Sequence, residues 1–166
     1  MIEYGSDLPG DVAAARELFR EYAKSIGIDL SFQGFEEELA TLPGKYAAPA
    51  GALIVARADG VPVGCVALRR IDQRTCEMKR LFVRPESRGL KIGAELVRRI
   101  IEAARARGYQ AMRLDTLQTI MRDAISLYQR FGFQDIEPYI YNPLPGARFM
   151  EKKLPPGPAR GAGSAG

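Results

Sequence analysis

Residues 77–93 read Glu-Met-Lys-Arg-Leu-Phe-Val-Arg-Pro-Glu-Ser-Arg-Gly-Leu-Lys-Ile-Gly, and this stretch decides the fold. Its first half is strand-like, Pro85 ends the strand, and a helix begins inside the second half. The helix pattern runs to Arg107, and a further strand-like run starts at Gln110. A strand, a helix and a second strand in this order predict a right-handed crossover between parallel strands.

The loop between that strand and that helix has the features of an anion-binding site. A helix N-terminus presents unpaired N–H groups and the positive end of the helix dipole. Gly89 and Gly93 permit a close approach of a ligand, and Arg88 and Lys91 add positive charge. The spacing is neither that of a P-loop nor the Gly-x-Gly-x-x-Gly of a dinucleotide site. The loop alone therefore indicates either a pyrophosphate cradle or an ordinary turn.

The rest of the sequence predicts antiparallel hairpins before this unit and strands and helices after it. Asp59-Gly60 is a strong signal for a two-residue hairpin turn. Together the elements predict a mixed sheet with helices on both faces, an α/β arrangement. The predicted strands cover 2–4, 52–58, 61–71, 75–83, 110–116 and 147–154, the predicted helices cover 11–26, 34–42, 92–107 and 122–130, and 134–141 is extended.

Length and composition limit the chemistry. The 166 residues correspond to one domain, which we expect at 1–154, followed by a disordered tail rich in Pro, Gly and Ala at 155–166. The chain has no His and two Cys, which excludes Ser-His-Asp and Cys-His catalysis and a structural zinc site. We expect no metal, and protons carried by Asp, Glu, Tyr, Lys, Cys or water. Few Cys and no basic leader or long apolar run predict a cytoplasmic protein with no membrane partner.

Charge is distributed unevenly along the chain. Residues 1–68 have a net charge of −5, residues 69–107 of +7, and residues 108–166 of +2. A concentrated basic segment suggests an anionic partner, such as a phosphate-bearing cofactor or a nucleic acid. The alternative is a solvated helix face with its Arg side chains pointing outward.

Two motifs at this separation carry a family resemblance. The stretch 77–93, followed by Leu-Tyr-Gln-Arg-Phe-Gly-Phe at 127–133, resembles the GCN5-related N-acetyltransferase (GNAT) superfamily over roughly residues 50–154. The resemblance implies a mostly antiparallel sheet splayed between two parallel central strands, with acetyl-CoA lying in the split. It assigns acetyl-CoA contacts to a strand segment and a loop: Leu81, Phe82, Val83, Arg88, Gly89, Leu90, Lys91, Ile92 and Gly93. The family pattern departs here at Lys91, where relatives carry glycine, and at Met121, where many carry asparagine.

The resemblance also suggests catalytic residues. Acyl transfer requires a neutral amine, so a base is useful, and Glu77 matches the position of a catalytic glutamate in some relatives. The alternative is an ion pair of Glu77 with Lys79 or a neighbouring Arg. Tyr128 lies at the usual position of the general acid that protonates the leaving thiolate, although its spacing alone fits a core aromatic residue. Cys65 and Cys76 are expected to be buried thiols.

The sequence thus favours an acetyl-CoA-dependent N-acetyltransferase that acts on a primary amine of a small molecule or peptide. Tyr139, Tyr141 and Asn142 are candidates for the border of the acceptor pocket. One alternative, motivated by Lys91 and Met121, is a degenerate acyl-CoA sensor with the same fold. A nucleic-acid binder ranks last, because no recognition motif accompanies the basic segment, and we expect no nucleic-acid partner. A homodimer stays open.

Overall fold

A computed structural model of the chain describes residues 1–6, 10–118 and 122–156. Most of the predicted tail and Met121 lie outside the described residues. Three short 3₁₀ helices accompany the main elements, at Ser31–Gln33, Gly44–Tyr46 and Pro85–Ser87. The strands are β1 (Ile2–Gly5), β2 (Ala52–Ala58), β3 (Val61–Arg70), β4 (Thr75–Val83), β5 (Ala111–Leu117), β6 (Gln134–Ile136) and β7 (Ala147–Lys153), and the helices are α1 (Asp11–Ile26), α2 (Phe35–Thr41), α3 (Ile92–Ala106) and α4 (Arg122–Arg130).

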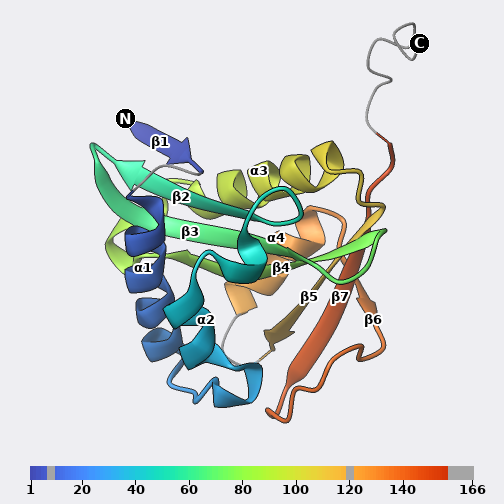
Figure 1. Cartoon of the computed structure of the whole chain (residues 1–166). Helices are drawn as coiled ribbons and strands as arrows, with labels where there is room; N and C mark the ends of the chain where they lie inside the picture. Colours follow the sequence, from blue (N-terminus) through green and yellow to red (C-terminus); the bar gives the residue numbers. More distant parts are fainter. Residues whose placement is uncertain (7–9, 119–121, 157–166) are drawn as a thin grey trace, which may run out of the picture.

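The strands form one mixed sheet in the order β1-β2-β3-β4-β5-β7-β6. Neighbouring strands are antiparallel except β4 and β5, which are parallel and joined through α3, so the predicted crossover is confirmed. Helices α1 and α2 cover one face of the sheet, and α3 and α4 cover the other (Figure 1). The α/β fold class, with helices on both faces, is therefore confirmed.

Local sequence explains most element boundaries. The turn between β2 and β3 has positive φ angles at both central residues, 49° at Asp59 and 85° at Gly60, as a tight hairpin turn requires. The extended segment predicted at 134–141 is wrong in length, because β6 ends at Ile136. Strand β6 is an edge strand paired with β7 alone, and Pro138 has no N–H to continue the ladder.

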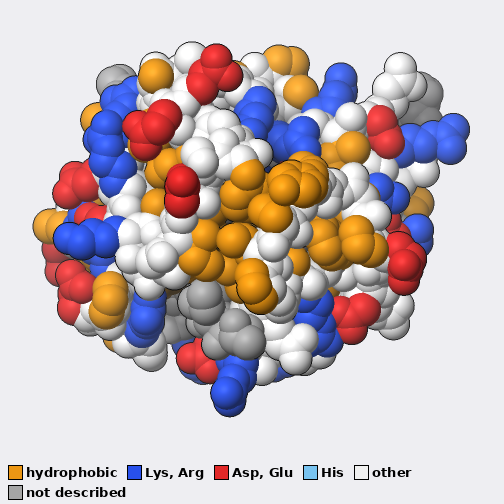
Figure 2. All heavy atoms as spheres, turned by 90° about the horizontal axis from the view of Figure 1, so that it is seen from below, with side chains coloured by type: hydrophobic (Ala, Val, Ile, Leu, Met, Phe, Trp, Pro, Cys, Tyr) orange, Lys and Arg blue, Asp and Glu red, His pale blue; other side chains and the backbone are white. Residues whose placement is uncertain are grey.

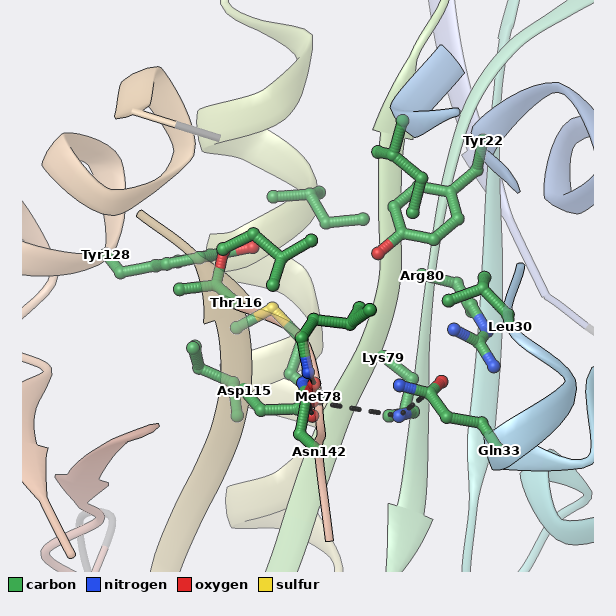
Figure 3. Close-up of a pocket in the computed structure, with 15 residues that line it drawn as sticks. Tyr22, Leu30, Gln33, Met78, Lys79, Arg80, Asp115, Thr116, Tyr128 and Asn142 are labelled. Atoms are coloured by element: carbon green, nitrogen blue, oxygen red, sulfur yellow. Dashed lines mark hydrogen bonds and ion pairs between the residues drawn. The ribbon is translucent and has the colours of Figure 1, made fainter. Parts of the chain in front are cut away.

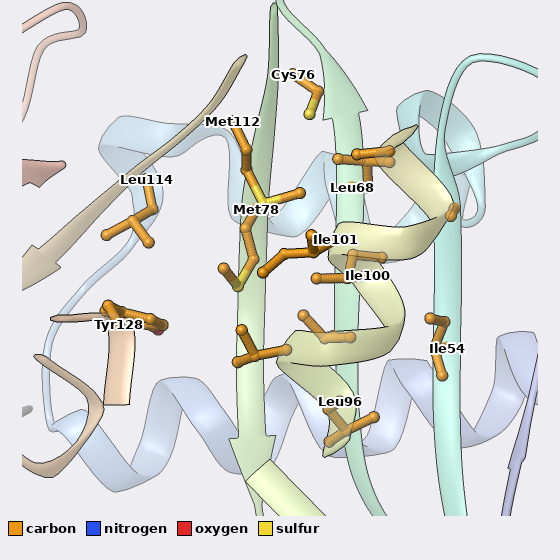
Figure 4. Close-up of a cluster of buried hydrophobic side chains, with 14 of the residues drawn as sticks. Ile54, Leu68, Cys76, Met78, Leu96, Ile100, Ile101, Met112, Leu114 and Tyr128 are labelled. Atoms are coloured by element: carbon orange, nitrogen blue, oxygen red, sulfur yellow. The ribbon is translucent and has the colours of Figure 1, made fainter. Parts of the chain in front are cut away.

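Two apolar cores hold the helices on the sheet. On one face, Leu96 and Ile100 of α3 are fully buried against Leu68, Met78 and neighbouring side chains of the sheet (Figure 4). On the other face, the buried stripe of α1 packs against β2 and β3. Burial of each large side chain contributes roughly 1.5–3 kcal/mol. The sheet is thus fixed from both sides, and this positions the site between β4 and β5. In the part of the chain that the structure describes, no helix is both long and apolar enough to cross a bilayer.

Candidate active site

The two central strands separate soon after they begin. Strands β4 and β5 pair at Thr75–Ala111, Cys76–Met112 and Glu77–Arg113, and no later pair joins them in the described residues, although β4 runs to Val83 and β5 to Leu117. Backbone groups on the facing edges beyond Glu77 therefore have no partner in this ladder. An unpaired strand edge inside a sheet offers N–H and C=O groups to an extended ligand.

A β-bulge in β4 shapes the same region. Residues Arg80 and Leu81 lie opposite the single residue Val66 of β3, and Arg80 has a φ of 63°. A bulge bends its strand and re-aims the side chains beside it. The consecutive residues Met78, Lys79, Arg80 and Leu81 all line one pocket beside this bulge.

A groove of about 680 Å³ runs from this gap to the start of α3. Of the nine residues predicted to contact acetyl-CoA, eight line the groove, and Leu90 is the exception with 60% of its surface exposed. Tyr22 and Ser25 of α1 and Ala124 and Leu127 of α4 form the opposite walls. On the face seen from below, apolar side chains gather in the middle, with charged ones toward the edge (Figure 2).

The loop before α3 has the backbone expected of an anion cradle. Gly89 has a φ of 93°, and the Arg88 Nε donates a hydrogen bond to the Val83 carbonyl oxygen at 3.1 Å. Lys91 precedes the first turn of α3 with a φ of 61°, which is the left-handed conformation. A glycine adopts this conformation without strain, whereas a lysine pays a conformational cost for it.

A narrower inner pocket of about 30 Å³ continues between the splayed strands. Tyr22 and Tyr128 reach toward it from opposite sides, while Lys79, Asp115 and Asn142 lie below them (Figure 3). Sequence reasoning did not select Tyr22, Lys79 or Asp115 for this site. Tyr22 belongs to the apolar stripe of α1 and has no signal that separates it from core aromatics.

Tyr128 lines the inner pocket, and its chain neighbour Leu127 lines the groove. Its ring packs edge-on against Phe133 at 5.8 Å between centroids. Burial raises the pKa of Tyr128 above its ordinary value of 10, and burial likewise raises the pKa of Tyr22. Both phenols are therefore protonated at neutral pH and are hydrogen-bond donors. The structure thus places the predicted acid in the pocket between the strands, and its role as an acid stays a prediction.

Glu77 is fully buried and its two carboxylate oxygens are engaged. Arg69 Nε donates to Oε1 at 2.7 Å, and the Tyr139 hydroxyl donates to Oε2 at 2.6 Å. Burial acts to raise the pKa of Glu77, but the charges of Lys79 and Arg69 and the Tyr139 hydrogen bond outweigh it and lower the pKa. This geometry matches the ion-pair alternative, with Arg69 as the partner. The role of Glu77 as a base stays a prediction.

The remaining candidates are divided between the pocket and the core. Asn142 lines the inner pocket and donates through Nδ2 to Asp115 Oδ2 at 3.0 Å. Tyr139 contacts Glu77 instead, and Tyr141 is 73% exposed. Cys65 and Cys76 are buried thiols, and burial raises the pKa of Cys76 to about 12. Across residues 1–6, 10–118 and 122–156, no cluster of three or more Cys, Asp or Glu has the arrangement of a metal site.

Comparison with known proteins agrees with this architecture. Residues 13–133 match the model of the acetyltransferase (GNAT) family. An uncharacterized N-acetyltransferase of Schizosaccharomyces pombe is 45% identical over 149 residues, which cover 89% of this chain and 91% of that protein. An IAA acetyltransferase of Azospirillum brasilense is 43% identical over 104 residues, covering 61% of this chain and 67% of that protein.

Solved structures give the same fold. The crystal structure of an acetyltransferase of Streptococcus agalactiae superposes with a TM-score of 0.75 at 26% identity, covering 92% of this chain and 98% of that one. The PaiA N-acetyltransferase of Thermoplasma acidophilum, solved in complex with coenzyme A, superposes with a TM-score of 0.72 at 21% identity, covering 92% and 99%.

Proposed function

Because the chain belongs to the acetyltransferase (GNAT) family, we propose that it transfers an acetyl group from acetyl-CoA to a primary amine of a small molecule or peptide. The observation that carries the proposal is the continuous path from the loop before α3 to the Tyr128 side chain. Basic and glycine residues lie at one end of this path, and an unpaired strand edge and a phenol lie at the other. A structural neighbour solved with coenzyme A supports the same ligand here.

The residues fit acetyl-CoA in three places. The left-handed Gly89 and Lys91 open the loop so that N–H groups at the start of α3 can receive a pyrophosphate. The free edge of β4 beyond Glu77 can pair with the amides of the pantetheine arm. When bound, acetyl-CoA supplies an acetyl thioester, whose carbonyl carbon accepts the amine. Tyr128 would then lie beside the sulfur.

The chemistry needs few groups. The neutral amine nitrogen forms a bond to the acetyl carbon, and the bond from that carbon to sulfur breaks. Tyr128 gives its proton to the leaving thiolate, and the proton lost from the amine passes to water or, in the predicted role, to Glu77 through water. Holding the amine and thioester in one narrow pocket contributes several kcal/mol without any acid or base.

A binding and turnover experiment tests this function. Calorimetry with acetyl-CoA should give saturable binding to the full chain. Thiol release should then depend on an added primary amine, with the acetylated amine identified by mass spectrometry. Binding of acetyl-CoA without transfer to any amine in a broad panel would favour the acyl-CoA sensor over the N-acetyltransferase. Absence of binding would contradict both functions.

Substitution of Lys91 by glycine should separate two effects of this residue. Glycine removes the cost of a left-handed lysine, so the free energy of unfolding is expected to rise by about 1 kcal/mol. Loss of the ammonium group should weaken CoA binding severalfold, because it removes a charge near the proposed phosphate site. Denaturant unfolding and calorimetry measure the two quantities.

Lys91→Ala is the matched control, because it removes the charge and keeps the strained backbone. It should weaken CoA binding like Lys91→Gly but without the gain in stability. Equal unfolding free energies for the two variants would show that the backbone is not strained. Unchanged CoA affinity in both would show that the lysine side chain makes no contact with CoA.

A further inference from the structure

The inner pocket contains an ion pair whose charged atoms are too far apart to form a hydrogen bond. The Lys79 Nζ lies 3.8 Å from Asp115 Oδ1, which is beyond hydrogen-bond distance. Two other ion pairs with a buried carboxylate are at hydrogen-bond distance: Arg80 donates to Glu38 at 2.8 and 3.0 Å, and Arg69 donates to Glu77 at 2.7 Å. The side chains of Lys79 and Asp115 are only 6% and 7% exposed, so water screens them little.

Two amides hold the halves of this pair in place. Gln33 Oε1 accepts a hydrogen bond from Lys79 Nζ at 3.3 Å, and Asn142 Nδ2 donates to Asp115 at 3.0 Å (Figure 3). These amides come from the segments before α2 and after β6, on opposite sides of the pocket. An ammonium group has three donors, and Lys79 uses one of them toward the residues that the structure describes. Each charge is thus positioned with capacity to bind a further partner.

The electrostatics favour an incoming anion at Lys79. Burial lowers the pKa of Lys79, and the charges of Arg80 and Lys45 act in the same direction, while Glu77 and Asp115 oppose them. With Asp115 at 3.8 Å and one hydrogen bond to Gln33, the buried ammonium has donor positions that no described residue fills. A carboxylate at this point would accept hydrogen bonds from these positions and oppose the effect of burial.

We propose that the acceptor is an amino acid or a similar zwitterion, whose carboxylate binds Lys79 and whose amino group lies at Asp115. This inference rests on the proposed acetyl transfer and names its acceptor class. The bound ammonium at Asp115 gives one proton to water before the neutral amine attacks, and Asp115 and Tyr128 line the same pocket. An amino acid carries its carboxylate and its amino group on one carbon, so it can contact the Lys79 ammonium and the Asp115 carboxylate at the same time.

Matched acceptor pairs test the proposal. Phenylalanine is compared with phenethylamine, and leucine with isoamylamine, so that each pair differs in the carboxylate. Thiol release with saturating acetyl-CoA gives kcat/KM for each compound. The expected preference for the amino acid is at least about 100-fold, because an analogue without the carboxylate leaves Lys79 uncompensated. Lys79→Met should reduce this preference to less than about 5-fold, and Lys79→Arg should retain most of it.

Lys153→Met is the matched control. It removes the same charge from a lysine whose side chain is 81% exposed, that pairs with Glu151 at 3.0 Å and that lies outside the inner pocket. The preference should not change in this variant. Thermal unfolding and the acetyl-CoA dissociation constant of each variant show that it is folded.

The possible results distinguish the acceptor assignment from the proposed acetyl transfer on which it rests. The acceptor assignment is overturned if both members of each pair are acetylated equally well, or if only the amines that lack a carboxylate are acetylated. Either result leaves the proposed acetyl transfer valid. If no amine is acetylated although acetyl-CoA binds, the transferase function fails. Calorimetry of phenylalanine and phenethylamine with the acetyl-CoA complex then decides the assignment, and equal affinity for the two overturns it.

Discussion

Replacement of Tyr128 by phenylalanine is expected to lower kcat for acetyl transfer by about 100-fold. The hydroxyl is the proton donor that the described pocket offers at the proposed position of the thiolate, and burial keeps its pKa above 10, so that it remains protonated. Phenylalanine retains the ring contact with Phe133. The acetyl-CoA dissociation constant should therefore stay within about twofold of the parent value. Steady-state thiol release and calorimetry measure the two constants.

Tyr109→Phe is the control for loss of a buried phenol. The Tyr109 hydroxyl donates to the Ala50 carbonyl at 2.7 Å, away from both pockets. This variant should lose about 1 kcal/mol of stability and keep its kcat. A Tyr128→Phe enzyme with kcat within threefold of the parent would exclude Tyr128 as the acid, and positioning would then account for the rate.

Replacement of Arg80 by methionine is expected to lower the free energy of unfolding by about 3–5 kcal/mol. Arg80 and Glu38 form a two-point ion pair with side chains only 2% and 3% exposed. Removal of Arg80 leaves the buried carboxylate with Lys45 at 3.4 Å as its charged partner in the described residues. Chemical denaturation at pH 7 measures the loss.

An exposed pair provides the comparison. Arg148 binds Asp135 with the same two-point geometry, at 2.6 and 2.9 Å, but Asp135 is 57% exposed. Arg148→Met should therefore lose at most about 1 kcal/mol. Replacing both Arg80 and Glu38 by methionine should recover part of the stability, because no uncompensated charge is then buried. Equal losses for Arg80→Met and Arg148→Met would contradict the buried-pair argument.

The contribution of the Arg80–Glu38 pair to stability depends on pH in a defined direction. Burial acts to raise the pKa of Glu38, but the hydrogen bonds and charge of Arg80 outweigh it and hold the pKa below its ordinary value of 4.5. A carboxyl whose pKa is lowered by folding contributes its full stabilisation at pH values above its pKa in the unfolded state. This stabilisation is lost as the pH falls through the pKa of the folded state. The stability difference between the parent and Arg80→Met should therefore narrow below about pH 4.

The sequence predicted the elements well because hydrophobic period and turn residues act locally. The bounds 11–26, 75–83 and 122–130 agree with α1, β4 and α4. The loop before α3 was predicted for the same reason, since its glycines and charges are contiguous. In the inner pocket, Tyr128 and Asn142 were predicted, whereas Tyr22, Lys79 and Asp115 were not. Lys79 and Arg80 both line the pocket, although strict strand alternation would place them on opposite faces.

The charge segments show the same limit of local reasoning. The basic excess at 69–107 suggested an external anion, yet two of its arginines pair with the acidic first third of the chain in the described residues. Arg84 binds Glu21 at 2.6 and 2.9 Å, and Arg80 binds Glu38. Long-range pairing of this kind cannot be read from segment charge. Arg88 and Lys91 remain at the groove, where the predicted anion would bind.

Because the backbone pairing of β4 and β5 covers only Thr75–Glu77 in the described part of the chain, the sheet has two halves that share one short ladder. One half consists of β1–β4 and the other of β5, β7 and β6. Beyond the ladder, the apolar core under α3 and the Lys79–Asp115 pair connect the two halves. A ligand that bonds to both halves would add to these connections. The width of the opening that an acceptor meets therefore depends on core packing and on this ion pair as well as on the three backbone pairs.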